Sequence, residues 1–219
     1  NAEQEMRLQM LAYQVDGVAS RVGSGHAFME RLKRNPSSID ELAQIAEVLE
    51  GRALPQSVAV PGLEWTQLCL HGHYRLNEIL TAVGFLTAEK RPLFNTGVLR
   101  LKDRKIELMF VTLDKRSGFH ESIAYHDYAV SPDIFHWQSQ NSAAPTTGIG
   151  KQYLGSIGEQ PNGWQFQLFV RSDPDSAYLA CGQVVFEESR GARPMNITWR
   201  LKIPLPAAAF SHFSVLRAA

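Results

Sequence analysis

One short segment of the chain combines side chains that could bind a flat, polar ring. From Tyr128 to Gln140 the sequence is YAVSPDIFHWQSQ, with three aromatic rings, a histidine and two glutamines within thirteen positions. Aromatic faces stack on a flat ring, while amide side chains donate to and accept from its edges. A nucleobase is a ring of this kind. The segment therefore predicts a base-binding site, on a stretch whose spacing favours a loop over a helix or a strand.

The candidate residues fall into a stacking group and a hydrogen-bonding group. The predicted stacking residues are Tyr128, Phe135, Trp137 and Tyr153. The predicted edge-reading residues are Asp127, His136, Gln138 and Gln140. Asp127 would accept from the exocyclic amine of a cytosine. The alternative interpretation is that Phe135 and Trp137 fill the core and their polar neighbours satisfy an irregular backbone, because most aromatic residues are buried for packing.

The overall charge does not indicate a polyanionic partner, because Lys and Arg total 22 and Asp and Glu also total 22. Basic residues nevertheless cluster between 100 and 116 and again between 190 and 202. If the sheet brings both clusters to one face, they would follow a phosphate backbone; otherwise they are ordinary solvated charges. The predicted phosphate contacts are Lys102, Arg104, Lys105 and Arg116.

Sequence motifs for catalysis or metal binding are absent. There is no GxxxxGK[ST] phosphate loop and no GxSxG nucleophile motif. Cys69, His71 and His73 alternate and would share one face of a strand, but no fourth metal ligand is evident. We therefore expect no metal, no cofactor and no catalysis in this domain.

Composition predicts a cytoplasmic protein that does not cross a membrane. The two cysteines, Cys69 and Cys181, are far apart and form no CxxC pair, so neither a disulfide framework nor a zinc knuckle is indicated. No run of about twenty apolar residues and no secretory leader is present. The start at Asn1, without Met, is expected for a piece of a longer protein.

The spacing of apolar residues divides the chain into a helical segment, residues 1–56, and a β-rich domain, residues 57–219. In the helical segment, apolar residues recur at steps of three and four from residue 3, which predicts a first helix. A second helix is expected at 26–33. A third is expected to begin at Ser38, because Ser38 and Glu41 form a capping-box pattern.

The β-rich domain is predicted from alternating residues and turn signals. The expected elements are a helix at 75–83, a hairpin at 98–112 turning near Asp103, strands at 165–171, 177–186 and 195–203, and a final helix at 207–215. Because few crossover helices separate the strands, we expect an α+β fold with a mainly antiparallel, curved sheet or small barrel.

Two segments together resemble a known family. They are LHGHYRLNEIL at 70–80 and the stretch from Asp127 to Gln140, with further support at 168–171, 189–195 and 197–206. They resemble the uncharacterised domain at the C-terminus of bacterial superfamily II helicases, proteins that often carry an N-terminal phospholipase-D-like nuclease. The resemblance covers about residues 65 to 206. The chain departs from the family pattern in lacking an acidic or basic run at 141–145.

Some proteins of this architecture resemble ATP-driven type IV restriction enzymes, whose C-terminal domains are likened to SRA/PUA-like β-barrels. The resemblance implies a target-recognition module that binds double-stranded DNA and reads a flipped, modified cytosine. ATP hydrolysis and DNA cleavage would then belong to the helicase and nuclease domains of the same polypeptide. Two other hypotheses stay open: a structural domain that docks on its helicase or a partner protein without binding DNA, and an autonomous nuclease or hydrolase, which has the least support.

Overall fold

The computed structural model of the protein describes residues 1–16, 23–50, 58–113, 127–155 and 162–215. The chain divides into two compact units. The first contains residues 1–59, 63–69 and 74–94, and the second contains residues 60–62, 70–73 and 95–219. None of the helices in the described ranges is long and apolar enough to span a bilayer.

The first unit is helical. Its helices are α1 (Ala2–Asp16), α2 (Gly25–Lys33), α3 (Pro36–Glu50) and α4 (Leu76–Ala82). Gly25 lets α1 and α2 approach closely, because a Cβ there would lie 2.5 Å from Cβ of Leu8. The predicted start of α3 at Ser38 was wrong by two residues: the helix begins at Pro36, whose fixed φ suits the first helical position.

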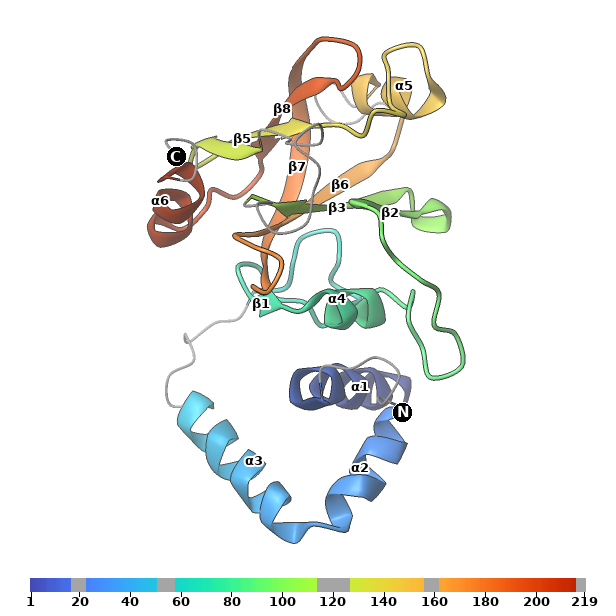
Figure 1. The fold of residues 1–219 in the computed structure, drawn as a ribbon, viewed down its shortest axis with the longest axis vertical. Helices are drawn as coiled ribbons and strands as arrows, with labels where there is room; N and C mark the ends of the chain where they lie inside the picture. Colours follow the sequence, from blue (N-terminus) through green and yellow to red (C-terminus); the bar gives the residue numbers. More distant parts are fainter. Residues whose placement is uncertain (17–22, 51–57, 114–126, 156–161, 216–219) are drawn as a thin grey trace. The chain divides into compact units, whose positions relative to one another are not determined.

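The second unit is built on a sheet (Figure 1). The strands are β1 (His73–Tyr74), β2 (Val98–Leu101), β3 (Ile106–Thr112), β4 (Tyr128–Ser131), β5 (Ile134–Gln138), β6 (Gln165–Arg171), β7 (Tyr178–Arg190) and β8 (Asn196–Leu201). The strand order is β2-β3-β6-β7-β8-β5-β4, and β1 pairs with β7 outside this path. Along the path only β3 and β6 are parallel. The prediction of an α+β fold with a mainly antiparallel, curved sheet is confirmed, and the sheet is open, with β2 and β4 at its edges.

The main hydrophobic cluster of the second unit lies on one face of this sheet. Its largest fully buried side chains include Phe135, Tyr153, Phe166 and Trp199. Two helices, α5 (Gly148–Leu154) and α6 (Ala207–Val215), supply further apolar side chains to the same cluster. Inward residues alternate with outward ones along β5 and β8, as the period of two requires.

The segment that was expected to be a loop is a β-hairpin, so that prediction was wrong. Strands β4 and β5 pair antiparallel, with Tyr128 opposite His136 and Ala129 opposite Phe135. A register shift between Ala129 and Ser131 interrupts the alternation, and a turn follows in which Ser131 Oγ donates to Asp133 Oδ1 at 2.6 Å. Because of this shift and turn, apolar and polar residues do not alternate regularly along the segment, so its sequence lacks the pattern that predicts strands.

Candidate nucleic-acid interface

The polar candidates of the β4–β5 hairpin project from the face of the sheet opposite the core. Because Phe135 and Trp137 point inward, their neighbours on β5 point outward. The pairing register extends this outward row onto the neighbouring strands. We define the outer patch as Tyr128 on β4, His136 and Gln138 on β5, and Asn196 and Thr198 on β8.

Two contacts organise the outer patch. The rings of Tyr128 and His136 stack with their centroids 4.9 Å apart and their planes 12° apart. Beside them, Gln138 Nε2 donates to Asn196 Oδ1 at 2.7 Å. Asp127 positions this strand end, because its Oδ1 accepts from the backbone N of Gln138 at 2.8 Å. The patch therefore presents a half-buried aromatic pair next to an amide pair.

Charges near the outer patch are balanced within the protein. Arg200 donates to both oxygens of Glu187, at 2.7 and 2.9 Å, and to Asp133 at 2.9 Å. The hydrogen bond from Arg200 lowers the pKa of Glu187, and a hydrogen bond from Ser131 is the main cause of the lowered pKa of Asp133. Because its carboxylate partners flank it, Arg200 contributes little net positive potential to this face.

Three of the four predicted stacking rings lie in the core and not on the outer patch. Phe135 and Tyr153 are fully buried and Trp137 is 5 % exposed. Trp137 packs edge-on against Tyr153, with ring centroids 5.4 Å apart. Gln140 is half-buried in the following turn, where its carbonyl accepts from the backbone N of Ala143. The structure therefore unites Tyr128, His136 and Gln138 but separates them from the buried rings.

The predicted phosphate contacts lie in a different part of the sheet. Lys102, Arg104 and Lys105 are exposed on the 3-10 turn (Lys102–Arg104) and its C-cap, between β2 and β3. In the strand order, β6, β7 and β8 separate this hairpin from β5 and β4. Arg116 lies outside the described residues.

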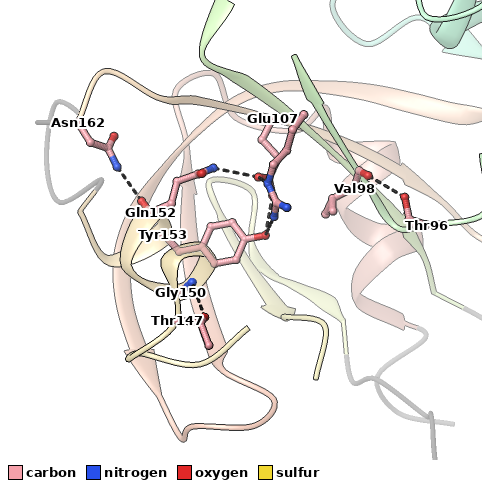
Figure 2. Close-up of polar contacts among 9 residues, drawn as sticks. Thr96, Val98, Glu107, Thr147, Gly150, Gln152, Tyr153 and Asn162 are labelled. Atoms are coloured by element: carbon pink, nitrogen blue, oxygen red, sulfur yellow. Dashed lines mark hydrogen bonds and ion pairs between the residues drawn. The ribbon is translucent and has the colours of Figure 1, made fainter. Parts of the chain in front are cut away.

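The predictions from residue types missed a buried polar cluster around Glu107, which Figure 2 shows. Glu107 on β3 is fully buried and accepts from Tyr153 Oη at 2.6 Å, from Arg100 Nε at 2.6 Å and from Gln152 Nε2 at 3.0 Å. Burial raises the pKa of Glu107, and the charge of Arg100 opposes that shift. Arg100 and Glu107 are cross-strand partners in the β2–β3 hairpin. Their opposite charges within the predicted hairpin are the one signal that could have found the pair.

The raised pKa of Glu107 predicts a pH dependence of stability. Since the carboxyl holds its proton more tightly in the folded state, the folded protein binds more protons between the unfolded and folded pKa values. The stabilisation linked to the raised pKa of Glu107 is therefore largest at low pH. It declines as the pH rises above about 4.5, the ordinary pKa of a glutamate. We expect the free energy of unfolding of the native protein, relative to Glu107→Gln, to fall with rising pH in urea titrations. If this free energy rises with pH instead, the charge of Arg100 lowers the pKa of Glu107 by more than burial raises it.

The alternating residues Cys69, His71 and His73 do not form a metal site. His71 adopts a left-handed conformation with φ of 60°, so the regular alternation of a strand is broken there. In the part of the chain that the structure describes, no three His, Cys, Asp or Glu side chains are grouped to hold a metal ion.

Comparison with known proteins gives the family of the chain. Residues 68–213 match the model of a domain family described as a domain of unknown function, DUF3427. No curated protein matches the sequence. The matched range contains every strand of the sheet and the whole outer patch. Because the match spans well over half of the 219 residues, the chain belongs to the DUF3427 family.

Proposed function

We propose that this domain binds DNA through the outer patch and that Tyr128, His136 and Gln138 contact an exposed base. The observation that carries the proposal is the stacked Tyr128–His136 pair beside the Gln138–Asn196 amide pair. Aromatic side chains on sheet surfaces stack with bases at about 1–3 kcal/mol per base, and amides read base edges. Both chemistries occur side by side on one outward-facing row.

The resemblance to helicase-associated domains extends the proposal. We infer that the base is a modified cytosine in double-stranded DNA, and that the domain directs a cytoplasmic restriction or defence protein to its target. ATP hydrolysis and DNA cleavage would belong to helicase and nuclease domains of the same polypeptide. The chain itself would bind without catalysis or a cofactor, so pure protein should leave plasmid DNA intact with Mg²⁺ or Mn²⁺.

The experiment is a binding titration with one duplex in three forms. The cytosines are unmodified, 5-methylated or 5-hydroxymethylated, and each form is measured at two salt concentrations. We expect one modified form to bind most tightly, and Tyr128→Ala to weaken that binding about tenfold by removing one stacking surface. Because Arg200 is already paired with carboxylates, we expect binding to depend only weakly on salt concentration.

The control variant is Leu93→Ala, since Leu93 is 86 % exposed and lies outside the outer patch. Trp137→Ala would be a poor test, because Trp137 is a core residue whose loss would damage the fold. Equal binding to all three duplexes with a steep salt dependence would instead indicate a module that follows the phosphate backbone. A triple Lys102, Arg104 and Lys105 to Ala variant would then reduce the salt slope.

A second candidate function is a docking domain, and helix α3 is the observation that favours it. No residue of α3 is buried, and its apolar residues are exposed: Ile39, Ile45, Val48 and Leu49 at 37 to 58 %. An apolar helix face of this kind is typical of a protein–protein contact. Absence of binding to all three duplexes would favour this function, with the helicase core or another protein as the partner.

A further inference from the structure

Helix α3 presents a continuous apolar face along its whole length. Ile39, Leu42, Ala46 and Leu49 follow one another at steps of three and four residues, so they share one side of the helix, and Ile45 lies beside them. No residue of α3 is buried, and Leu42 alone among these five is half-buried. A stripe of this width is the kind of surface that a helix buries against another helix.

The charged residues of α3 all have the same sign. They are Asp40, Glu41, Glu47 and Glu50, and all four are exposed. The helix contains no Lys, Arg or His. None of the salt bridges among the described residues involves these four carboxylates. The apolar face therefore lies within a negative potential.

The negative charge is most exposed to a partner at the C-terminal end of α3. Glu47 and Glu50 lie in the last turn, which has no basic residue. The last turn also carries the negative end of the helix dipole, where cations stabilise a helix and anions destabilise it. Lys33 and Arg34 precede the opposite end of the helix. A cationic group beside the last turn would therefore relieve an unfavourable interaction within α3.

The charge of α3 distinguishes between the possible occupants of its apolar face. An amphipathic helix that lies on a membrane normally carries Lys and Arg, which attract anionic lipids. A second copy of the chain would bring a second set of carboxylates against the first, and like charges across an interface weaken association. A cationic partner is attracted at long range and can pack against the apolar face at short range.

We propose that α3 docks an amphipathic helix whose polar positions carry Lys and Arg. The apolar side of the partner helix would pack on Ile39, Ile45 and Leu49, and its cations would lie near Glu47 and Glu50. This inference rests on the docking function given above as the second candidate, and it adds the chemistry of the partner. It is independent of DNA binding, because α3 and the outer patch share no residue.

The test measures the binding of three synthetic peptides to the protein by fluorescence anisotropy. The cationic peptide repeats the heptad LKKLLKA three times, and the acidic peptide has Glu in place of every Lys. The scrambled peptide keeps the composition of the cationic peptide but has no apolar face. We expect the cationic peptide to bind at least about tenfold more tightly than either of the others, because it alone combines the required charge with an apolar face.

Two variants of α3 separate the apolar contribution from the charge contribution. Ile45→Gln should weaken binding of the cationic peptide about tenfold, because it removes an apolar contact while glutamine keeps a high helix propensity. Val15→Gln on α1 is the matched control, since Val15 is 52 % exposed and Ile45 is 54 % exposed. Reversing the charge with Glu47→Lys and Glu50→Lys together should lose the cationic peptide and gain the acidic one. All three side chains are exposed, and circular dichroism checks that each variant keeps its helix content.

Each other outcome would overturn a defined part of this inference. Equal binding of the cationic and acidic peptides would overturn the cationic partner but leave the docking function standing. Scrambled peptide that binds as tightly as the cationic one would indicate attraction between charges without docking on the apolar face. Absence of binding to every peptide would overturn both the cationic partner and docking through α3. The titrations with modified duplexes test the outer patch separately, so failure of DNA binding would not be confused with any of these results.

Discussion

Replacing Glu107 by Ala is expected to lower the free energy of unfolding by about 3–5 kcal/mol. The carboxylate is fully buried and accepts three hydrogen bonds, from Tyr153, Arg100 and Gln152. Its removal leaves the Arg100 guanidinium, only 23 % exposed, without its charge partner, and leaves the Tyr153 hydroxyl without its acceptor. Uncompensated buried polar groups, and not the loss of attraction alone, produce the large effect. Urea denaturation followed by circular dichroism measures it.

Gln152→Ala is the matched control for this prediction. It removes one donor to the same carboxylate but leaves the Arg100 and Tyr153 contacts in place. We expect a smaller loss, about 1.5–3 kcal/mol, as for a single hydrogen bond to a charged group. If Glu107→Ala costs no more than Gln152→Ala, the cluster is not a determinant of stability.

Gly150→Ala should destabilise the protein by about 3 kcal/mol or more, although glycine to alanine within a helix normally stabilises by about 1 kcal/mol. Gly150 lies in α5, directly beneath the preceding turn. A Cβ at this position would lie 1.8 Å from the carbonyl oxygen of Ala144, which no real contact allows. Because the obstacle is backbone and not a flexible side chain, either the turn or the helix must move.

The displaced helix would carry two of the donors to Glu107 with it. Thr147 caps α5 by accepting from Gly150 N at 3.1 Å, and Tyr153 and Gln152 follow on the same helix (Figure 2). We therefore expect Gly150→Ala also to change the near-ultraviolet circular dichroism of the aromatic core. Gly148→Ala is the control, because a Cβ at Gly148 meets nothing within 4 Å. It should be neutral or slightly stabilising, and equal effects of the two substitutions would contradict the steric argument.

The regular strands were predictable because local alternation and turn residues determine them. Strand β6 occupies residues 165–171, as predicted, and the β2–β3 hairpin turns at Asp103, as predicted. The same local rules missed α5, whose sequence GIGKQYL contains two glycines with low helix propensity. The Thr147 cap and packing of Tyr153 against the core stabilise this helix, and neither is visible as periodicity.

For the candidate site, too, one part could be predicted from the sequence and another could not. Residue types alone drew attention to the segment from Tyr128 to Gln140, since its rings and amides suit a base. The sequence did not reveal which rings face outward, because a one-residue shift in strand register exchanges the two faces. Pairing with β8 decides this, burying Phe135 and Trp137 against Trp199 and leaving Tyr128 and His136 outside.

Patterns among near neighbours in the chain were thus enough to predict the fold class and most element positions, but not the β4–β5 hairpin, which was expected to be a loop. The outer patch and the Glu107 cluster could be found only in the tertiary structure. Each unites side chains from stretches that lie far apart in sequence: Glu107 meets Tyr153 across 46 positions, and Gln138 meets Asn196 across 58. Such meetings depend on strand order and helix packing, for which a single sequence carries no periodic signal.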